Sequence, residues 1–306
     1  MLKLIRSEEN PILTPSNLPW ENLLVFNPGA VVVDDKIFLI YRAQGKGDLH
    51  SRLGMATSSD GINFERRTSP LYYGGGHADE TLGIEDPRIV KIEGTYYITY
   101  TAVSEDLHAE INPNWREKIA KKPRIALSTT QDFKTYIDYD VIIPDLSGKN
   151  SSFFPKKVNN EFWLLYRKGA YHTYFARSSS LTSWSQSSPV FDKRPGMWDS
   201  KRTGIGAPPI ETEKGWLLFY HGVDEQNTYR LGIIFLDLED PLKILYRSPE
   251  PVLEPEKDYE KYGFVPNVVF TCGAVEKDGK YYVYYGACDH VIGVATIEKQ
   301  AVLGLF

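Results

Sequence analysis

The chain has little cysteine, and this scarcity limits the kinds of site it can carry. Its 306 residues include only two cysteines, Cys272 and Cys288, and they form no CxxC motif and lie beside no histidine cluster. We therefore expect both to be small apolar fillers rather than metal ligands or disulfide partners.

The sequence also lacks signals for a membrane and an excess of positive charge. Residues 1–10, MLKLIRSEEN, contain no apolar core long enough for a signal peptide, and no run of about 18 apolar residues occurs. The net charge of −5 gives no general attraction to nucleic acid or anionic lipid, so any anion site must be local. We expect a cytoplasmic protein with no nucleic-acid or membrane partner.

Several catalytic motifs are missing as well. The chain has no GxxxxGK[ST], HExxH, GxSxG or DxDxDG motif, and its six histidines are scattered. Nucleotide, zinc-peptidase, serine-esterase and EF-hand functions therefore have no support. We expect neither a metal nor an organic cofactor.

What the chain does contain is a repeat built from strands. Five times, a short apolar strand, a turn and a second apolar strand end in a tyrosine: Tyr41, Tyr100, Tyr166, Tyr220 and Tyr285. The intervals between these tyrosines are 59, 66, 54 and 65 residues. This pattern predicts an all-β, five-bladed β-propeller that forms a single catalytic domain over residues 1–306.

Two details of the repeat concern the ring and its surface. The last copy is one strand short, and we expect the segment before Asn27 to complete that blade and close the ring. The charged segment 112–122 is the one predicted helix, a short insertion in the second blade. The oligomeric state is open, and the region near Trp115 is a candidate subunit contact in a homo-oligomer.

A propeller brings equivalent positions of its blades to one axial funnel. The start of the innermost strand lies 14 residues before the tyrosine in four copies and 16 before it in the third, at Asn27, Asp86, Asn150, Gly206 and Thr271. Asp86 is the single acid among them, so we predict that it transfers a proton. The alternative is a structural ion pair with Arg88.

The residues directly after the tyrosines bring positive charge to the same funnel. Arg42, Arg167 and His221 occupy this position in three copies, and Lys149, Lys201 and Arg202 lie near strand starts. Basic groups at equivalent positions of an acidic chain predict an anion pocket, and the forked guanidinium of arginine suits phosphate. The alternative is that each is a solvated surface charge.

These residues lie within longer motifs: FNPGA, GIEDPRIV, GAPPIETEKGWLLFYHGV, LDLEDPLKILYRS and FVPNVVFTCGAV…YYGACD. In this order, and over nearly the whole chain, the motifs resemble glycoside hydrolase family 130, the mannoside phosphorylases and related β-mannosidases on a five-bladed propeller. The resemblance implies an inverting phosphorylase that cleaves β-mannosides with inorganic phosphate and releases α-mannose 1-phosphate. Its partners are then a mannose-containing oligosaccharide and phosphate as co-substrate.

The resemblance also implies roles for individual residues. Asp86 becomes the general acid, and its proton reaches the glycosidic oxygen through a hydroxyl of the bound mannose. The implied sugar-binding residues are Asn27, Arg42, Arg52 and Asp289. We assign Arg88, which flanks Asp86, to the same set. The implied phosphate-binding residues are Lys149, Asn150, Arg167, Arg202, Tyr220 and His221.

The chain departs from the family pattern at two of these positions. Lys149 stands where arginine is common, and Arg202 stands where lysine is common, so the charges are kept while the fork geometry is exchanged. The sequence GIEDPR is more similar to members that act on β-1,2-mannosides than to those that act on β-1,4-mannosides.

Hydrolysis remains an alternative to phosphorolysis. An inverting hydrolase needs a base about 6.5–9.5 Å from its acid, and Glu85, Asp224 and Glu225 are the candidates. Phosphate is already a nucleophile, so a basic cradle replaces the base, which favours phosphorolysis. A furanosidase-type propeller is disfavoured because it would carry acids at three strand starts. A non-catalytic carbohydrate-binding propeller is disfavoured because neutral sugars do not require a basic pocket.

Overall fold

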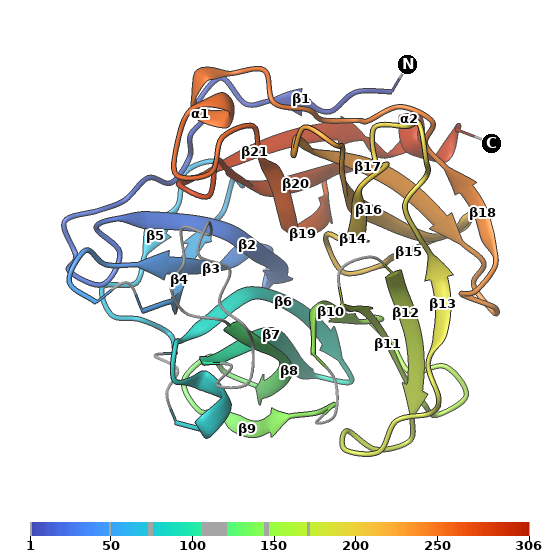
Figure 1. The fold of residues 1–306 in the computed structure, drawn as a ribbon, viewed down its shortest axis with the longest axis horizontal. Helices are drawn as coiled ribbons and strands as arrows, with labels where there is room; N and C mark the ends of the chain where they lie inside the picture. Colours follow the sequence, from blue (N-terminus) through green and yellow to red (C-terminus); the bar gives the residue numbers. More distant parts are fainter. Residues whose placement is uncertain are drawn as a thin grey trace.

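Five antiparallel sheets surround a common centre in this protein, one for each copy of the repeat (Figure 1). The structure is a computed structural model that describes residues 2–48, 50–72, 76–105, 121–143, 147–169 and 172–305. The five-bladed propeller predicted from the tyrosine repeat is confirmed.

In blades one to three the strands follow one another outward from the centre in chain order. Blade one contains β2 (Leu24–Val33), β3 (Lys36–Gln44), β4 (Arg52–Ser58) and β5 (Glu65–Arg66). Blade two contains β6 (Ile84–Ile92), β7 (Thr95–Glu105), β8 (Lys121–Thr130) and β9 (Ile137–Val141). Blade three contains β10 (Gly148–Phe153), β11 (Phe162–Lys168), β12 (His172–Ser178) and β13 (Ser188–Phe191).

Blades four and five complete the ring. Blade four contains β14 (Arg202–Ile205), β15 (Ile210–Thr212), β16 (Gly215–Val223), β17 (Tyr229–Leu236) and β18 (Ile244–Arg247). Blade five contains β19 (Val269–Lys277), β20 (Lys280–Ala287) and β21 (Val291–Glu298), with β1 (Ile5–Arg6) as its fourth strand. The short helical elements are η1 (Ala78–Glu80), α1 (Asp258–Lys261) and α2 (Lys299–Leu303).

The N-terminal segment closes the ring as expected. Strand β1 pairs antiparallel with β21, and Ile5 lies opposite Thr296. The last blade therefore combines the two ends of the chain, which removes an exposed sheet edge.

The tight turns use the residues that the sequence offers for them. Asp34 and Asp35 join β2 to β3, Asn159 and Asn160 lie between β10 and β11, and all four have φ between 45° and 65°. Aspartate and asparagine adopt this left-handed conformation more easily than most residues, which makes hairpins possible at these places.

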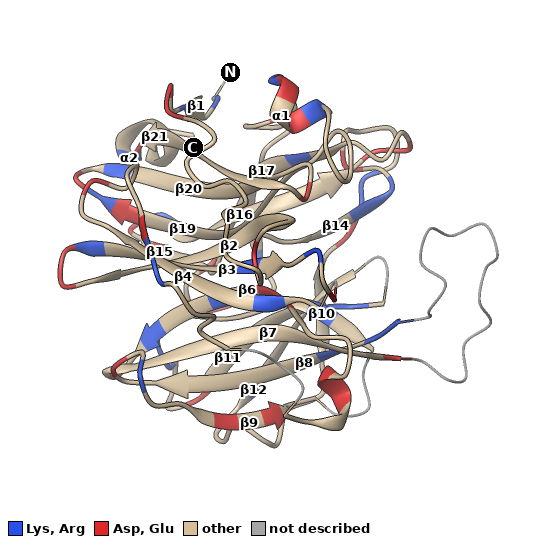
Figure 2. Cartoon of the chain, turned by 90° about the vertical axis from the view of Figure 1, so that its left-hand side faces the viewer, with Lys and Arg blue, Asp and Glu red and all other residues tan. Residues whose placement is uncertain are grey.

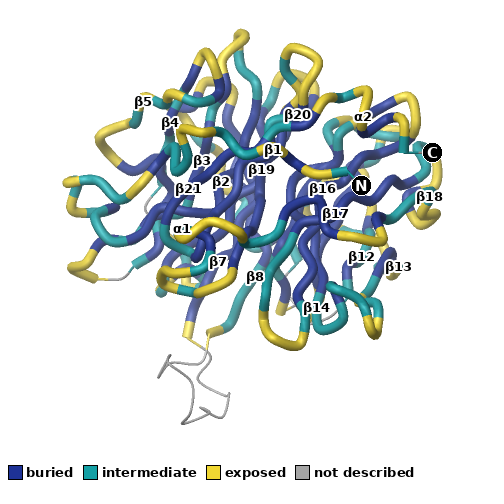
Figure 3. The backbone as a smooth tube through the Cα atoms, turned by 90° about the horizontal axis from the view of Figure 1, so that it is seen from above, coloured by how far each residue is buried: buried dark blue, intermediate teal, exposed yellow. Residues whose placement is uncertain are grey.

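The hydrophobic cores lie between neighbouring blades, and buried strands fill the interior (Figure 3). Near the axis the inner strands approach so closely that glycine is required. A Cβ atom on Gly273 of β19 would lie 2.3 Å from the backbone nitrogen of Ala30 in β2. The glycines that follow the axial positions therefore allow neighbouring inner strands to contact each other backbone to backbone.

Three smaller expectations can be compared with the structure. Cys272 and Cys288 are free and buried, as predicted. Most of the predicted helix at 112–122 lies outside the described residues, but Lys121 and Lys122 begin strand β8 rather than end a helix. Within the described ranges, no helix has the length and apolarity needed to cross a bilayer.

Candidate functional site

A β-bulge turns the side chains at the axial positions toward the funnel. The pairing register shifts between Phe26 and Gly29 in β2, between Glu85 and Arg88 in β6, and between Lys149 and Ser152 in β10. The axial residues inside these three bulges are Asn27, Asp86 and Asn150, with φ of 49°, 54° and 55°. A bulge commonly redirects a side chain next to a functional site. The same local deformation in three blades thus points three polar side chains at one place.

These residues line a cavity of about 160 Å³ at the axis. Its polar and charged lining consists of Asn27, Arg42, Glu85, Asp86, Lys149, Asn150, Arg167, Arg202, His221, Tyr229 and Asp289, and its apolar lining of Val265, Val268 and Phe270. The predicted acid and most of the predicted phosphate residues therefore share one cavity.

One side of this cavity, which we call the acid wall, carries Glu85, Asp86 and Asp289. Asn27 Nδ2 donates a hydrogen bond to Asp86 Oδ1 at 2.8 Å. Arg42 contacts both acids of blade two, with Nη2 2.7 Å from Glu85 Oε1 and Nη1 3.6 Å from Asp86 Oδ1. Asp86 is only 7% exposed. The acid is thus buried, hydrogen bonded and next to a cation.

A second group of lining residues, which we call the basic wall, consists of Lys149, Arg167, Arg202 and His221 from blades three and four. No carboxylate of the described residues lies within ion-pair distance of these three cationic side chains. The Nε atoms of Arg167 and Arg202 are buried without a hydrogen-bond partner. Both ring nitrogens of His221, which is fully buried, are also without one. Buried polar groups are normally paired, so these nitrogens mark a place where a ligand can bind.

Two close packing contacts shape the basic wall. A Cβ atom on Gly204 would lie 2.6 Å from His221 Cε1 and 3.0 Å from Asn150 Nδ2, so only glycine fits between them. The His221 ring lies against Phe270, with ring centroids 4.7 Å apart. The imidazole is therefore held in place beside backbone that a small anion can approach.

The electrostatics differ between the two walls. Burial raises the pKa of Asp86, but Arg42 and Lys149 outweigh this effect and hold the pKa below its ordinary value. Burial raises the pKa of Asp289 to about 7. On the basic wall, burial lowers the pKa of Lys149 and, helped by Arg167, that of His221. His221 is consequently a neutral imidazole in the free protein near pH 7, although the sequence suggested a cation.

Comparison with known proteins places this geometry in a family. The sequence model of glycoside hydrolase family 130, described as beta-1,4-mannooligosaccharide phosphorylase, matches residues 4–306. The chain belongs to glycoside hydrolase family 130. The family that the sequence motifs resemble is thereby confirmed.

Individual members of family 130 are similar over their whole length. The chain is 41% identical to a 1,2-beta-oligomannan phosphorylase of Thermoanaerobacter sp. (strain X514), an alignment that covers 98% of this chain and 99% of the relative. It is 40% identical to a beta-1,2-mannobiose phosphorylase of the same organism, with 99% of each chain covered. The solved complex of the beta-1,2-mannobiose phosphorylase from Listeria innocua with beta-1,2-mannobiose has a TM-score of 0.84 at 29% identity, with 98% of each chain covered.

Three residues that the sequence placed in the site of this family 130 protein lie outside the cavity lining. Arg52, at the start of the third strand of blade one, forms an ion pair with Asp48. Tyr220 is fully buried, and its hydroxyl donates to Asp199 Oδ2 at 2.8 Å. Arg88 is also buried. Its side chain donates to backbone oxygens, those of Gly206 at 2.6 Å and Asp86 at 3.1 Å among them.

The contacts of Arg88 show whether Asp86 forms a structural ion pair with it. Arg88 of blade two reaches Ile205 and Gly206 of blade four and so connects two blades across the axis. It contacts the main chain of Asp86 and forms no ion pair with the carboxylate. The ion pair between the two side chains that the sequence left open is therefore not formed.

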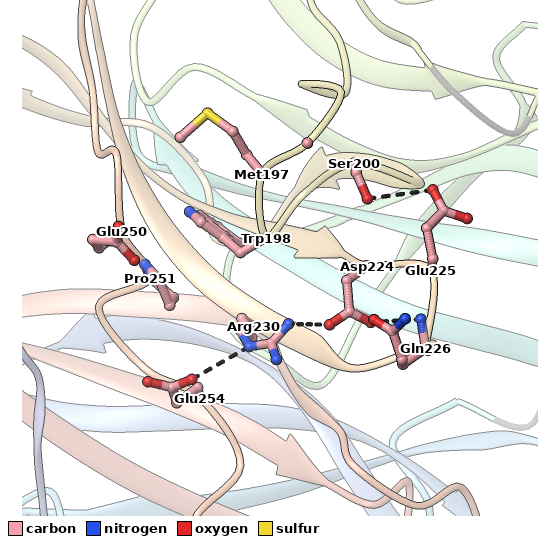
Figure 4. A pocket seen from close by; sticks show the side chains of 11 residues that line it. Met197, Trp198, Ser200, Asp224, Glu225, Gln226, Arg230, Glu250, Pro251 and Glu254 are labelled. Carbon is pink, nitrogen blue, oxygen red and sulfur yellow. Dashed lines mark hydrogen bonds and ion pairs between the residues drawn. The ribbon is translucent and has the colours of Figure 1, made fainter.

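Two of the three residues considered as the base for hydrolysis also lie outside the axial cavity. Asp224 and Glu225 line a separate hollow of about 390 Å³ (Figure 4). There Asp224 pairs with Arg230 at 2.6 Å, and Glu225 accepts a hydrogen bond from Ser200. Of the three candidates, only Glu85 lines the axial cavity, and Arg42 and Lys121 lie beside it.

The sequence reasoning missed Tyr229 and the apolar lining. The hydroxyl of Tyr229 accepts a hydrogen bond from Arg202, and the guanidinium lies 5.4 Å from the ring centroid. Phe270 lies opposite Gly286 in blade five, as Lys149 lies opposite Arg167 in blade three. Gly286 and Arg167 both directly follow the repeat tyrosine, so Phe270 and Lys149 occupy equivalent positions. Phe270 directly precedes the axial residue Thr271, so alignment of the repeat was a usable signal for it. Tyr229 had no comparable signal.

Proposed function

We propose that this protein is an inverting β-mannoside phosphorylase that transfers a mannosyl group from a β-1,2-linked manno-oligosaccharide to inorganic phosphate. The observation that carries the proposal is the basic wall, where buried arginine and imidazole nitrogens without partners line the same cavity as Asp86. Phosphate matches these donors in charge and in hydrogen-bonding capacity. No organic cofactor or metal has a part in the proposed reaction.

In this reaction a phosphate oxygen attacks C1 of the mannosyl unit from the side opposite the leaving group. The bond between C1 and the glycosidic oxygen breaks, and a proton from Asp86 passes through a hydroxyl of the bound mannose to that oxygen. The products are α-mannose 1-phosphate and a mannoside shortened by one unit. Lys149, Arg167 and Arg202 hold the phosphate, while Asn27 orients the Asp86 carboxyl group.

The low pKa of Asp86 in the free protein is compatible with an acid role only if ligand binding changes it. An acid must be protonated, but Arg42 and Lys149 favour the ionised form. Phosphate bound at Lys149 adds negative charge beside Asp86 and offsets the field of that lysine, which raises the pKa. We therefore infer that phosphate both supplies the nucleophile and favours the protonated acid.

The linkage proposal rests on relatives rather than on geometry. The family description names β-1,4-mannooligosaccharides, whereas the two relatives at 40–41% identity are named for β-1,2-linked substrates. The GIEDPR sequence around Asp86 is also more similar to the β-1,2 group. These points support β-1,2-mannobiose or a longer β-1,2-mannan as the substrate.

The cavity offers weak support for hydrolysis. Asp224 and Glu225 are outside it, and Glu85 is occupied by Arg42 at 2.7 Å. A carboxylate base would also have to act next to the basic wall, where nearby cations lower its affinity for a proton and so make it a weaker base. Water-activated cleavage is therefore the second candidate and the other outcome of the test.

The test is incubation of the purified protein with β-1,2- and β-1,4-mannobiose, with and without inorganic phosphate. We expect mannose 1-phosphate from the β-1,2 substrate and only when phosphate is present. Free mannose released at the same rate without phosphate would indicate a hydrolase. No turnover of either disaccharide would contradict both enzymatic functions.

A further inference from the structure

The loop between α1 and β19 carries two large aromatic side chains on its surface. Tyr262 is 73% exposed and Phe264 is 57% exposed. Among the described residues, the other exposed large apolar side chains are aliphatic and lie on other elements. Exposed aromatic side chains commonly mark a binding surface.

Backbone contacts fix this loop to the strands that build the cavity. The amide of Val265 donates to the carbonyl oxygen of Cys288 at 2.9 Å, and the amide of Tyr229 donates to that of Asn267 at 3.0 Å. A Cβ atom on Gly263 would lie 2.5 Å from Cys288 Cβ, so the loop fits closely against the residue before Asp289. The exposure of the two aromatic rings is thus not the result of a loosely attached segment.

The helix that begins the loop is also anchored. Glu260 of α1 is fully buried and accepts hydrogen bonds from Arg6 Nε and from the hydroxyl of Tyr285, both at 2.8 Å. The backbone amides of Glu256 and Lys257 also donate to its carboxylate. A rigid support lowers the entropy cost of binding to the side chains it presents.

The loop lies at the rim of the axial cavity. Val265 and Val268, from the same segment as the two exposed rings, line the cavity. Helix α1 and strand β14 of the basic wall lie toward the same side of the molecule (Figures 2 and 3). The cavity of about 160 Å³ is below the range of about 300–1,000 Å³ that encloses larger ligands. An oligosaccharide must therefore extend over the rim.

We propose that Tyr262 and Phe264 form a stacking platform for the acceptor sugars, the part of the manno-oligosaccharide that is not transferred to phosphate. This inference rests on the proposed function. The C–H faces of a pyranose are apolar and pack against aromatic rings, while the hydroxyl groups at its edge stay in water. Neither ring carries a charge, which suits a neutral glycan.

A second copy of this chain is the competing occupant of the surface, since exposed aromatics also occur in subunit interfaces. The two occupants predict different results. A sugar platform affects the Michaelis constant for the acceptor, whereas an interface affects the oligomeric state.

The experiment measures synthesis from mannose 1-phosphate and mannobiose in the double variant Tyr262→Ala/Phe264→Ala. We expect KM for mannobiose to rise about 5- to 10-fold. KM for mannose 1-phosphate should change less than about 2-fold, because the basic wall is untouched. The variant Tyr262→Phe, which keeps the ring, should retain the wild-type KM for mannobiose. Ile137→Ala, at a 63% exposed site on β9, is the matched control and should change neither constant.

Two results would overturn the platform: an unchanged KM for mannobiose or equal increases for both substrates. An unchanged KM together with a smaller oligomer in sedimentation velocity would assign the surface to a second copy of the chain instead. Calorimetric titration of mannobiose without phosphate separates this test from the proposed function. If the wild type binds mannobiose but transfers no mannose, the phosphorylase proposal fails. Weaker binding by the double variant then still supports the platform, and equal binding contradicts it.

Discussion

The two walls of the axial cavity are built from the same repeat but are paired very differently. On the acid wall, Asp86 has Asn27 and Arg42 as partners, and Glu85 has Arg42. On the basic wall, Arg167, Arg202 and His221 keep buried nitrogens without partners. The position directly after the repeat tyrosine therefore carries a paired arginine in blade one, Arg42, and unpaired nitrogens in blades three and four, at Arg167 and His221.

This difference separates a catalytic acid that is already paired from buried basic groups that are not. Burying a charge without a partner is costly, and proteins rarely do so unless a ligand completes the pairing. Asp86 is paired without a ligand, whereas the phosphate that we propose would pair the buried cations of the basic wall. The contrast predicts that changes on the acid wall affect chemistry and that changes on the basic wall affect phosphate binding.

The largest expected effect comes from removing the acid. Asp86→Asn keeps the size of the side chain but cannot deliver the proton, so we expect the turnover number to fall by about 10²- to 10⁴-fold. KM for phosphate should not rise, because the basic wall is intact and one negative charge is removed. Steady-state kinetics check both constants, and thermal unfolding checks the fold. Activity above a tenth of the wild type would count against the acid assignment.

The next largest effect is expected from a substitution on the basic wall. Arg167→Ala removes a guanidinium that we propose donates to phosphate, and the loss of charged hydrogen bonds predicts a rise in KM for phosphate of about 10- to 100-fold. KM for the mannoside should change less than about 2-fold.

Two matched variants sharpen the Arg167 result. Arg167→Lys keeps the charge without the fork and should fall between Ala and the wild type. Arg52→Ala removes an arginine that pairs with Asp48 outside the cavity and should leave both constants nearly unchanged. Equal increases in both Michaelis constants for Arg167→Ala would indicate a structural arginine instead.

Much of the site was predictable because it follows the repeat. Counting from the tyrosines located Asn27, Asp86 and Asn150, and the position after the tyrosine located Arg167 and His221, all of which line the cavity. Ring closure by the N-terminal segment was predictable for the same reason, because a missing strand in one copy leaves an unpaired edge.

The positions that sequence reasoning did not place depend on geometry outside the repeat. Tyr220 directly precedes His221 in β16, and successive strand residues point to opposite faces, so both cannot point into one cavity. Arg52 lies on the third strand from the axis. Tyr229 and Val265 reach the cavity through strand register and a loop that no local pattern specifies.

A smaller effect, on stability, should come from Asp289 of the acid wall. Burial raises its pKa from an ordinary value of about 3.9 to about 7. Between these values the native state holds a proton that the unfolded state has lost. The stabilising contribution is therefore full below about pH 4, is lost as the pH rises through about 7, and does not change above it.

The side chain in Asp289→Asn stays neutral at every pH, so the variant should not lose this contribution to stability as the pH rises. We expect the variant to gain about 1 kcal/mol over the wild type between pH 5 and pH 8, a figure reduced for solvent screening of a partly exposed group. Urea unfolding at the two pH values measures the difference, and other titrating groups cancel because both proteins contain them. Parallel stability curves would show that Asp289 has no raised pKa.

The last prediction tests whether Tyr220 contributes to phosphate binding. In four blades the repeat tyrosine donates its hydroxyl to a fully buried carboxylate: Glu21, Glu80, Asp199 and Glu260 accept from Tyr41, Tyr100, Tyr220 and Tyr285 at 2.7–2.8 Å. In blade three, Tyr166 contacts Ser187 instead. Tyr220 thus belongs to a structural series that connects each middle strand to a neighbouring loop.

Tyr220→Phe should therefore lower stability and leave phosphate use unchanged. Asp199 keeps Arg194 and Arg247 as partners, at 3.0 and 2.6 Å, so we expect a loss of about 2 kcal/mol rather than unfolding. Tyr166→Phe, which loses only a hydrogen bond to a neutral hydroxyl, should lose about 1 kcal/mol. Urea denaturation measures both variants. A tenfold rise in KM for phosphate in Tyr220→Phe would instead place this hydroxyl in the phosphate site, because removal of a purely structural contact does not change one substrate constant selectively.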